Sequence, residues 1–125
     1  IIKEKGYIVL AAALELKPGD RKEIKEKMDE LKQRRVEKQP LDMPSAGSTF
    51  KRPEGYFAGK LIMDAGLRGF SVGGAQISEK HCGFVVNTGK ATANDVLTLI
   101  REVQKRVRDK FGVELETEVK FLGEF

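Results

Sequence analysis

The sequence predicts an α+β fold in which a small mixed sheet packs against helices. Segments with the period-two pattern of strands and segments with the 3.6-residue period of helices occur in mixed order along the chain. Turn residues separate these segments. The chain has 125 residues, of which 40% are apolar, and this is long enough for one compact core but short for two.

An apolar run at residues 7–16 predicts the first strand, because it ends in the turn signature Lys-Pro-Gly-Asp at residues 17–20. Its longest uninterrupted apolar part, residues 8–14, is far below the roughly 20 residues that cross a bilayer. The single cysteine, Cys82, excludes an internal disulfide and fits a reducing compartment. We therefore expect a cytoplasmic protein with no membrane partner. Because the chain starts at Ile1 and not at Met, we also expect a fragment of a longer protein.

Residues 20–38 predict a helix that faces solvent on most of its circumference. Charged residues dominate it, and Ile24, Met28 and Leu31 form one narrow apolar stripe at helical spacing. Asp20 is the expected N-cap. The segment at residues 39–44 then ends the helix, because its two prolines restrict the backbone to extended geometry and lead into a new unit.

The middle of the chain predicts one short helix and two strands. The helix is expected at residues 57–65, with Gly66 as its C-terminal cap. Residues 70–77 and 83–87 read as strands that pair as a hairpin. The glycine pair at residues 73–74 interrupts the first of them, and we interpret it as a bulge or tight turn, since it lacks the longer spacing of a phosphate-binding loop.

Residues 93–111 give the clearest helix signal, with one apolar face and a capping-box pattern at Thr92 and Asp95. Gly112 ends this helix. Residues 113–122 then alternate apolar and charged side chains, which is the pattern of a half-buried strand.

The charge balance of the chain suggests an anionic partner without identifying one. Lys and Arg number 23 against 19 Asp and Glu, which gives a net charge of +4 and a pI of about 9.2. One reading is a small basic nucleic-acid-binding module. The basic helix at residues 21–38 carries five acids interspersed among its eight bases, so it does not present a continuous positive stripe. We therefore expect no nucleic-acid partner, and an ordinary solvated surface is the alternative explanation of the charge.

Residues 47–53 form the most unusual candidate site. Gly47 allows close approach of a ligand to the backbone, Ser48 can donate a proton or hydrogen bond, and Lys51 and Arg52 add positive charge. This combination suits an anion or a developing carbanion, and a plain surface turn is the alternative.

Two further pairs of side chains are candidates for a functional site. Glu116 and Glu118 lie on the same face of the last expected strand, as an acidic pair or as a solvated face. His81 and Cys82 are adjacent and lack the further soft ligands that zinc needs, so we expect no metal site.

Several segments together resemble the C-terminal domain of UDP-N-acetylenolpyruvoylglucosamine reductases in order and spacing. These segments are residues 39–41 (QPL), 44–53 (PSAGSTFKRP), 58–62 (AGKLI), 65–69 (AGLRG), 72–75 (VGGA), 78–81 (SEKH), 83–87 (GFVVN) and 115–119 (LETEV). The resemblance implies that residues 39–125 are the C-terminal substrate-binding domain. It is weaker over residues 1–38, which it implies are the end of the flavin-binding domain and its connecting helix.

The resemblance implies an oxidoreductase of peptidoglycan synthesis, and so a role in cell-wall biogenesis, cell shape, cell division and the cell cycle. In this family NADPH reduces bound FAD, and the flavoprotein then reduces UDP-N-acetylglucosamine enolpyruvate to UDP-N-acetylmuramate. FAD and NADPH are therefore the implied cofactors, with FAD bound mainly by a domain outside this chain.

Residue roles carry over only where the motifs match. Ser48 matches the serine proposed as proton donor, and Glu118 matches the catalytic glutamate near the substrate carboxylate. Gly47, Lys51 and Arg52 are the implied substrate-binding residues, although Arg52 stands where some relatives carry Asn. The family's catalytic arginine lies in an upstream Tyr-Arg motif that this chain does not contain, so the chain alone is expected to be inactive.

Overall fold

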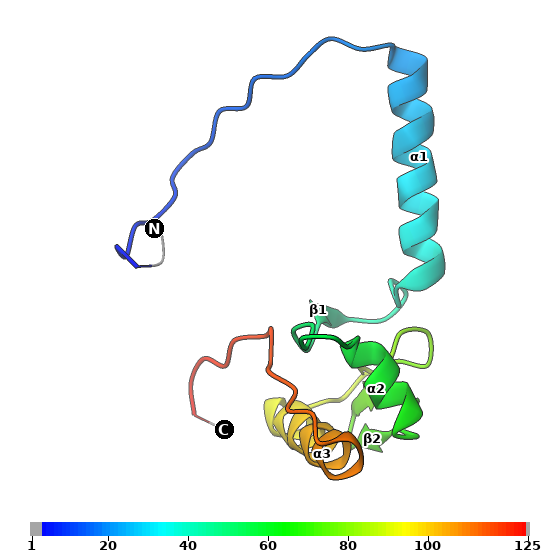
Figure 1. Ribbon diagram of the computed structural model, residues 1–125, viewed down its shortest axis with the longest axis vertical. Coiled ribbons are helices and arrows are strands. Elements are labelled where there is room, and N and C mark those ends of the chain that lie inside the picture. The colour runs from blue at the N-terminus through cyan, green and yellow to red at the C-terminus, as the bar shows by residue number, and fades with distance from the viewer. Residues whose placement is uncertain (1–3, 125) are drawn as a thin grey trace. The chain divides into compact units, whose positions relative to one another are not determined.

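A computed structural model describes residues 4–124, and the chain divides into two units, residues 1–32 and 33–125. Over the described residues, three helices and a four-stranded sheet confirm the α+β class (Figure 1). The elements are α1 (Arg21–Lys38), β1 (Ser45–Ser48), α2 (Ala58–Asp64), β2 (Ser71–Val72), β3 (Ala75–Ile77), β4 (Phe84–Asn87) and α3 (Ala93–Phe111). No helix in the described part is long and apolar enough to cross a membrane.

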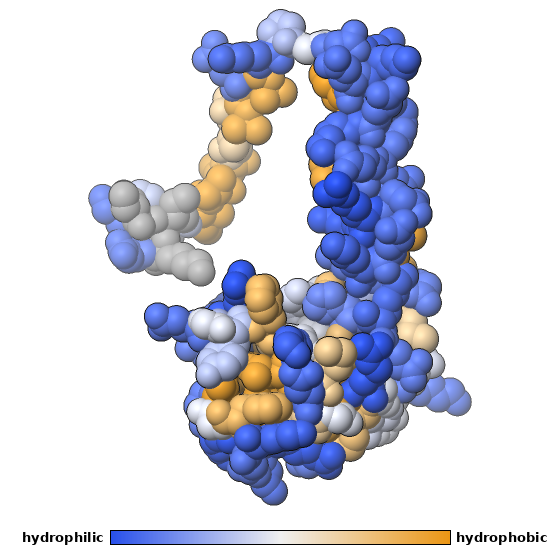
Figure 2. All heavy atoms as spheres, turned by 45° about the vertical axis from the view of Figure 1, so that its right-hand side comes forward, coloured by the Kyte–Doolittle hydropathy of each residue, from blue (hydrophilic) through white to orange (hydrophobic). Residues whose placement is uncertain are grey.

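The strand predicted at residues 7–16 is not formed. The segment has no strand partner among the described residues, and its apolar side chains are exposed, up to 92% at Leu10. A strand needs a neighbour to satisfy its backbone donors and acceptors, so an apolar pattern alone does not make one. Figure 2 shows these apolar side chains as an orange run along the extended segment.

Helix α1 forms as predicted and is charged on nearly its whole surface, which appears almost entirely blue in Figure 2. Asp20 caps it, because its Oδ1 accepts hydrogen bonds from the backbone N–H groups of Lys22 and Glu23, both at 2.9 Å. None of its residues is buried, and even Ile24 and Met28 of the apolar stripe are 50% and 62% exposed.

The sheet has the order β1-β4-β3-β2, and all three pairings are antiparallel, whereas we expected a mixed sheet. The reason lies in the connections: β2, β3 and β4 follow one another through short turns, which reverse the chain, while a parallel pair needs a long crossover. The expected hairpin is confirmed in the β3–β4 pair, and the turn at residues 73–74 joins β2 to β3.

The core lies between the sheet and two helices, with α3 packed against β2, β3 and α2 (Figure 1). Its largest fully buried side chains are Ile62, Leu67, Ile77, Val86, Leu99, Ile100, Val103 and Val107. The boundaries of α3 match the prediction: Thr92 and Asp95 form a capping box, and Gly112 takes a left-handed conformation at the C-terminal end with φ 67°.

The strand predicted at residues 113–122 is reduced to a single bridge between Phe50 and Thr117. The alternation itself is real, since Leu115 is 2% exposed and the flanking glutamates point to solvent. Two backbone hydrogen bonds flank the bridge, from Lys51 N to Glu116 O and from Glu118 N to Thr49 O, each 2.9 Å. The pairing is therefore too short for a regular strand, but it fixes this segment beside residues 49–51.

Asp95 joins the start of α3 to the β2–β3 turn. Its Oδ2 accepts hydrogen bonds from Thr92 N at 2.9 Å and from Gly74 N at 3.3 Å. These bonds lower the pKa of Asp95, the bond from Thr92 most. The folded pKa is thus below the unfolded value of about 3.9, so the stabilisation is complete above that value and is lost as pH falls through the folded pKa.

We expect Asp95→Asn to unfold at a lower urea concentration than the parent chain at pH 7. We also expect the difference between the two midpoints to shrink as pH is lowered toward 3, because the parent then loses the same charged acceptor. Urea titrations followed by circular dichroism at several pH values measure this. Asp109→Asn, at an exposed aspartate of the same helix, is the control, and an unchanged pH profile in Asp95→Asn would contradict the role given to Asp95.

Candidate functional site

The motif at residues 47–53 begins on the edge strand β1, which the sequence did not predict. Gly47 has φ 83°, and the pairing of β1 with β4 is irregular between Ser45 and Ser48. A left-handed residue in an edge strand produces a local bulge, and only glycine adopts it without strain. The bulge leaves Ser48 exposed at the end of the strand, opposite Phe84.

The two residues after Ser48 anchor the motif. Thr49 and Phe50 are only 3% and 5% exposed. The Thr49 hydroxyl accepts a 3.0 Å hydrogen bond from Val85 N, and Thr49 N donates to Gly83 O at 2.8 Å. Thr49 therefore fixes the position of Ser48, because both its backbone and its side chain are hydrogen-bonded.

Side chains from this motif and from residues 57–83 surround a cleft of about 430 Å³, which we call the cationic cleft. Ser48, Phe50 and Arg52 all line it, as expected for alternate residues of an extended chain. Its further polar lining comes from Lys60, Arg68, Lys80 and His81. No Asp or Glu is among the described residues that line it, so the cleft is suited to an anion.

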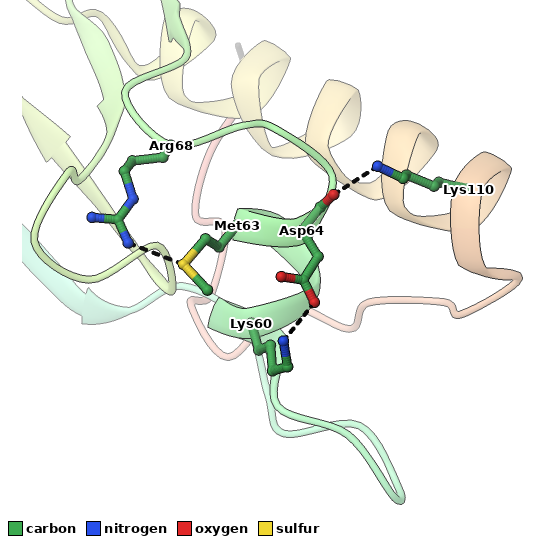
Figure 3. Close-up of polar contacts among 5 residues, drawn as sticks. All are labelled: Lys60, Met63, Asp64, Arg68 and Lys110. Carbon is green, nitrogen blue, oxygen red and sulfur yellow. Dashed lines mark hydrogen bonds and ion pairs between the residues drawn. The ribbon is translucent and has the colours of Figure 1, made fainter.

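Two of the cations are held by contacts around α2 (Figure 3). Arg68 donates from Nη1 to Glu79 O at 2.7 Å and from Nη2 to the Met63 sulfur at 3.0 Å. Lys60 lies one turn before Asp64, and their side chains form a 2.8 Å ion pair. The guanidinium is thus fixed by uncharged acceptors, and it retains its full positive charge toward the cleft.

Lys80 and His81 come from the loop that precedes β4. Lys80 Nζ donates to Val36 O at 2.7 Å. His81 Nδ1 accepts a 3.1 Å hydrogen bond from Gly83 N, and its ring meets Phe84 edge to face with a centroid separation of 4.9 Å. In this arrangement Nδ1 is the acceptor, so the neutral ring carries its proton on Nε2 and can donate it to a ligand.

Cys82 is the one thiol at the cleft, and it is 5% exposed. Burial raises its pKa, and the nearby Arg68 partly offsets the rise. A thiol with a raised pKa is protonated at neutral pH and is a poor nucleophile, so Cys82 forms part of the wall.

Lys51 lies in a different environment from Ser48 and Arg52. Its Nζ is 2.7 Å from Glu116 Oε2. The hydrogen bond and the charge of Glu116 raise the pKa of Lys51, and Glu118 adds a smaller rise. Lys51 does not line the cationic cleft, and its charge is already shared with a carboxylate.

The structure brings most of the sequence-predicted site residues onto two adjacent segments. Glu118 is exposed, and its backbone N–H is bonded to Thr49 O, next to Ser48 in the chain. Ser48 and Arg52 share the cationic cleft, whereas Glu118 and Lys51 do not line it. Sequence reasoning missed Lys60, Arg68 and Lys80, and it considered His81 only as a metal ligand. These side chains converge only after α2 and the loop before β4 fold against β1.

In the part of the chain that the structure describes, no three His, Cys, Asp or Glu side chains lie close enough to hold a metal ion.

Comparison with known proteins gives consistent relatives. Residues 39–122 match the family described as UDP-N-acetylenolpyruvoylglucosamine reductase, C-terminal domain. A UDP-N-acetylenolpyruvoylglucosamine reductase of Agathobacter rectalis is 70% identical over 125 residues, which is 100% of this chain and 40% of that protein. Another, of Lachnoclostridium phytofermentans, is 64% identical over 124 residues, or 99% of this chain and 40% of that protein.

A solved structure agrees with these relatives. The crystal structure of UDP-N-acetylenolpyruvylglucosamine reductase from Thermus caldophilus matches with a TM-score of 0.68 and 44% identity. The match covers 83% of this chain and 37% of that one. The chain therefore spans about 40% of the length of the curated relatives that it matches.

Proposed function

Because the chain belongs to the family of the C-terminal domain of UDP-N-acetylenolpyruvoylglucosamine reductase, we propose that it is the substrate-binding part of such a reductase. In this proposal residues 39–125 bind UDP-N-acetylglucosamine enolpyruvate, and residues 1–38 are the end of the flavin-binding domain and its connecting helix. The complete protein would act in the cytoplasm in peptidoglycan synthesis. The relatives named above are reductases, and nothing in the comparisons supports the nucleic-acid-binding alternative.

The observation that carries the proposal is the cationic cleft beside Ser48. The substrate carries a diphosphate and a carboxylate, and both need positive or hydrogen-bonding partners. Arg52 and Arg68 present planar guanidinium groups, which bind phosphate oxygens in pairs of parallel hydrogen bonds. The cleft would therefore hold the anionic part of the substrate close to the serine hydroxyl.

Ser48 is proposed to donate the proton that completes reduction of the enolpyruvyl double bond. Hydride adds to one carbon of the double bond, and negative charge develops on the neighbouring carbon. A positioned proton donor lowers the barrier to protonation of that carbon. A hydroxyl is a weak acid in water, but nearby positive charge favours its ionised product. Gly47 would allow the close approach of the substrate, Glu118 would act near the substrate carboxylate, and Lys51 would contribute through its pair with Glu116.

FAD and NADPH are the cofactors that the family implies, and FAD would supply the hydride when bound. Among the described residues, the glycine-rich turn that could cradle a flavin phosphate is not free to do so. The glycine pair at residues 73–74 is packed against Asp95 and Ala91, so it offers no open cradle of backbone N–H groups for a dinucleotide. We therefore assign FAD to the part of the longer relatives that lies outside this chain, and the isolated chain is expected to be inactive.

A titration of the chain with UDP-N-acetylglucosamine enolpyruvate tests the proposal, followed by NMR of the backbone amides. We expect shifts at Ser48, Arg52 and Arg68. We also expect Arg68→Ala to weaken binding by about tenfold or more, since hydrogen bonds to charged groups contribute about 1.5–3 kcal/mol. Lys105→Ala, an exposed lysine of α3 that does not line the cleft, is the control. If both variants weaken binding equally, general electrostatic attraction explains it, and the specific site is wrong.

A further inference from the structure

Phe57 is an exposed aromatic side chain at the cationic cleft, and the roles proposed so far do not use it. Its side chain is 60% exposed, although it lines the cleft. It occupies the N-cap position of α2 with an extended backbone, φ −117° and ψ 119°, and its side chain makes no capping hydrogen bond. Neither burial in the core nor capping of the helix therefore explains a phenylalanine at this position.

The Phe57 ring is held in a defined place. Its backbone carbonyl accepts hydrogen bonds from Lys60 N and Leu61 N, both at 3.1 Å. The guanidinium carbon of Arg52 lies 4.0 Å from the centroid of the ring, and Arg52 Nε donates to Tyr56 O at 3.3 Å. One face of the ring is thus covered by a cation that also lines the cleft, and Phe57 still remains 60% exposed, so it is accessible to a ligand.

We propose that Phe57, backed by Arg52, is the stacking platform for the nucleobase of the bound uridine nucleotide. This inference rests on the proposed function, because it assumes that the cationic cleft holds the diphosphate. A nucleotide carries a flat aromatic base at one end and its phosphates at the other. A cleft that holds the phosphates with cations and carries an exposed ring at the same place can contact both parts. Base-on-ring stacking adds affinity without reading the base edges.

If Phe57 is a stacking platform, its removal should affect UDP and pyrophosphate differently, which a site for anions alone does not predict. UDP contains the base, whereas inorganic pyrophosphate contains only the charge. Phe57→Ala is therefore expected to weaken UDP binding by about fivefold to a hundredfold, the range that base–aromatic stacking supports, and to leave pyrophosphate binding unchanged. Phe57→Trp, which enlarges the aromatic face, is expected to retain or strengthen UDP binding.

Isothermal titration calorimetry of the 125-residue chain with UDP and with pyrophosphate measures these affinities. Tyr7→Ala is the matched control, because Tyr7 is 62% exposed, has the Lys5 ammonium 5.9 Å from its ring centroid, and does not line the cleft. Phe57 lies outside the buried core, and circular dichroism checks that the variants keep the parent fold.

Each outcome decides the inference. A selective loss of UDP affinity in Phe57→Ala, with rescue in Phe57→Trp, supports the platform. Equal weakening of UDP and pyrophosphate, or no change in either, overturns it and leaves the anion cleft in place. If the parent chain binds neither compound, the cleft itself fails as the substrate site, and the platform fails with it.

Discussion

Replacing Ser48 by alanine in a complete reductase that contains this chain is expected to lower kcat by about 10²–10⁴-fold, the usual contribution of a positioned general acid. The hydroxyl is the proposed proton source, and without it the proton would come from water or from a group that is not positioned for this transfer. The substrate dissociation constant is expected to change little, because the cations of the cleft remain. Steady-state turnover and a separate binding titration measure the two quantities.

The control for this experiment is Ser71→Ala, which removes an exposed hydroxyl from β2 that does not line the cleft. Its turnover should match the parent within a factor of two or so. If Ser48→Ala retains the parent kcat, another group supplies the proton. If it weakens substrate binding and leaves kcat unchanged, Ser48 is a binding residue and not the acid.

The helices could be predicted from the sequence because their signals are local. Capping at Asp20 and at Thr92 with Asp95 depends on residues three or fewer positions apart, and the bond at Gly112 that ends α3 reaches back four residues, to Arg108. Strands depend on distant partners. The run at residues 7–16 has a strand pattern but no described neighbour, while β1 contains Ser, Ala and Gly and forms a strand because β4 lies beside it.

The candidate site shows the same division between local and distant information. The motif containing Ser48 and Arg52 is contiguous, so the sequence identified both residues. The other polar side chains of the cleft come from three separate segments. Lys60 lies on α2, Arg68 follows α2, and Lys80 and His81 lie in the loop before β4. Their approach depends on the packing of α2 and on the β3–β4 register, which no local pattern encodes. Lys51 differs again, since its partner Glu116 is 65 residues away.

Gly74→Ala is expected to lower the free energy of unfolding by about 1–3 kcal/mol, the cost of forcing extra volume into a packed site. A methyl group on Gly74 would lie 2.6 Å from the carbonyl carbon of Lys90 and still closer to the Ala91 nitrogen. Both obstacles are backbone atoms, which do not rotate away. Gly74 also cannot shift freely, because its N–H donates to Asp95 and its carbonyl accepts from Thr88 N at 2.9 Å.

Gly19→Ala is the matched control for the effect of adding a methyl group. A methyl there would meet only the end of the Ile24 side chain, at 3.1 Å, and that flexible group can move aside. We expect a change within about 0.5 kcal/mol in urea titrations followed by circular dichroism. If Gly74→Ala lowers the free energy of unfolding and Gly19→Ala does not, the glycine pair is needed for the close packing of the β2–β3 turn against residues 90–91. Equal stability of the two variants would mean that residues 90–91 move aside without a change in the free energy of unfolding. The close packing of the glycine pair would then not be what stabilises the β2–β3 turn.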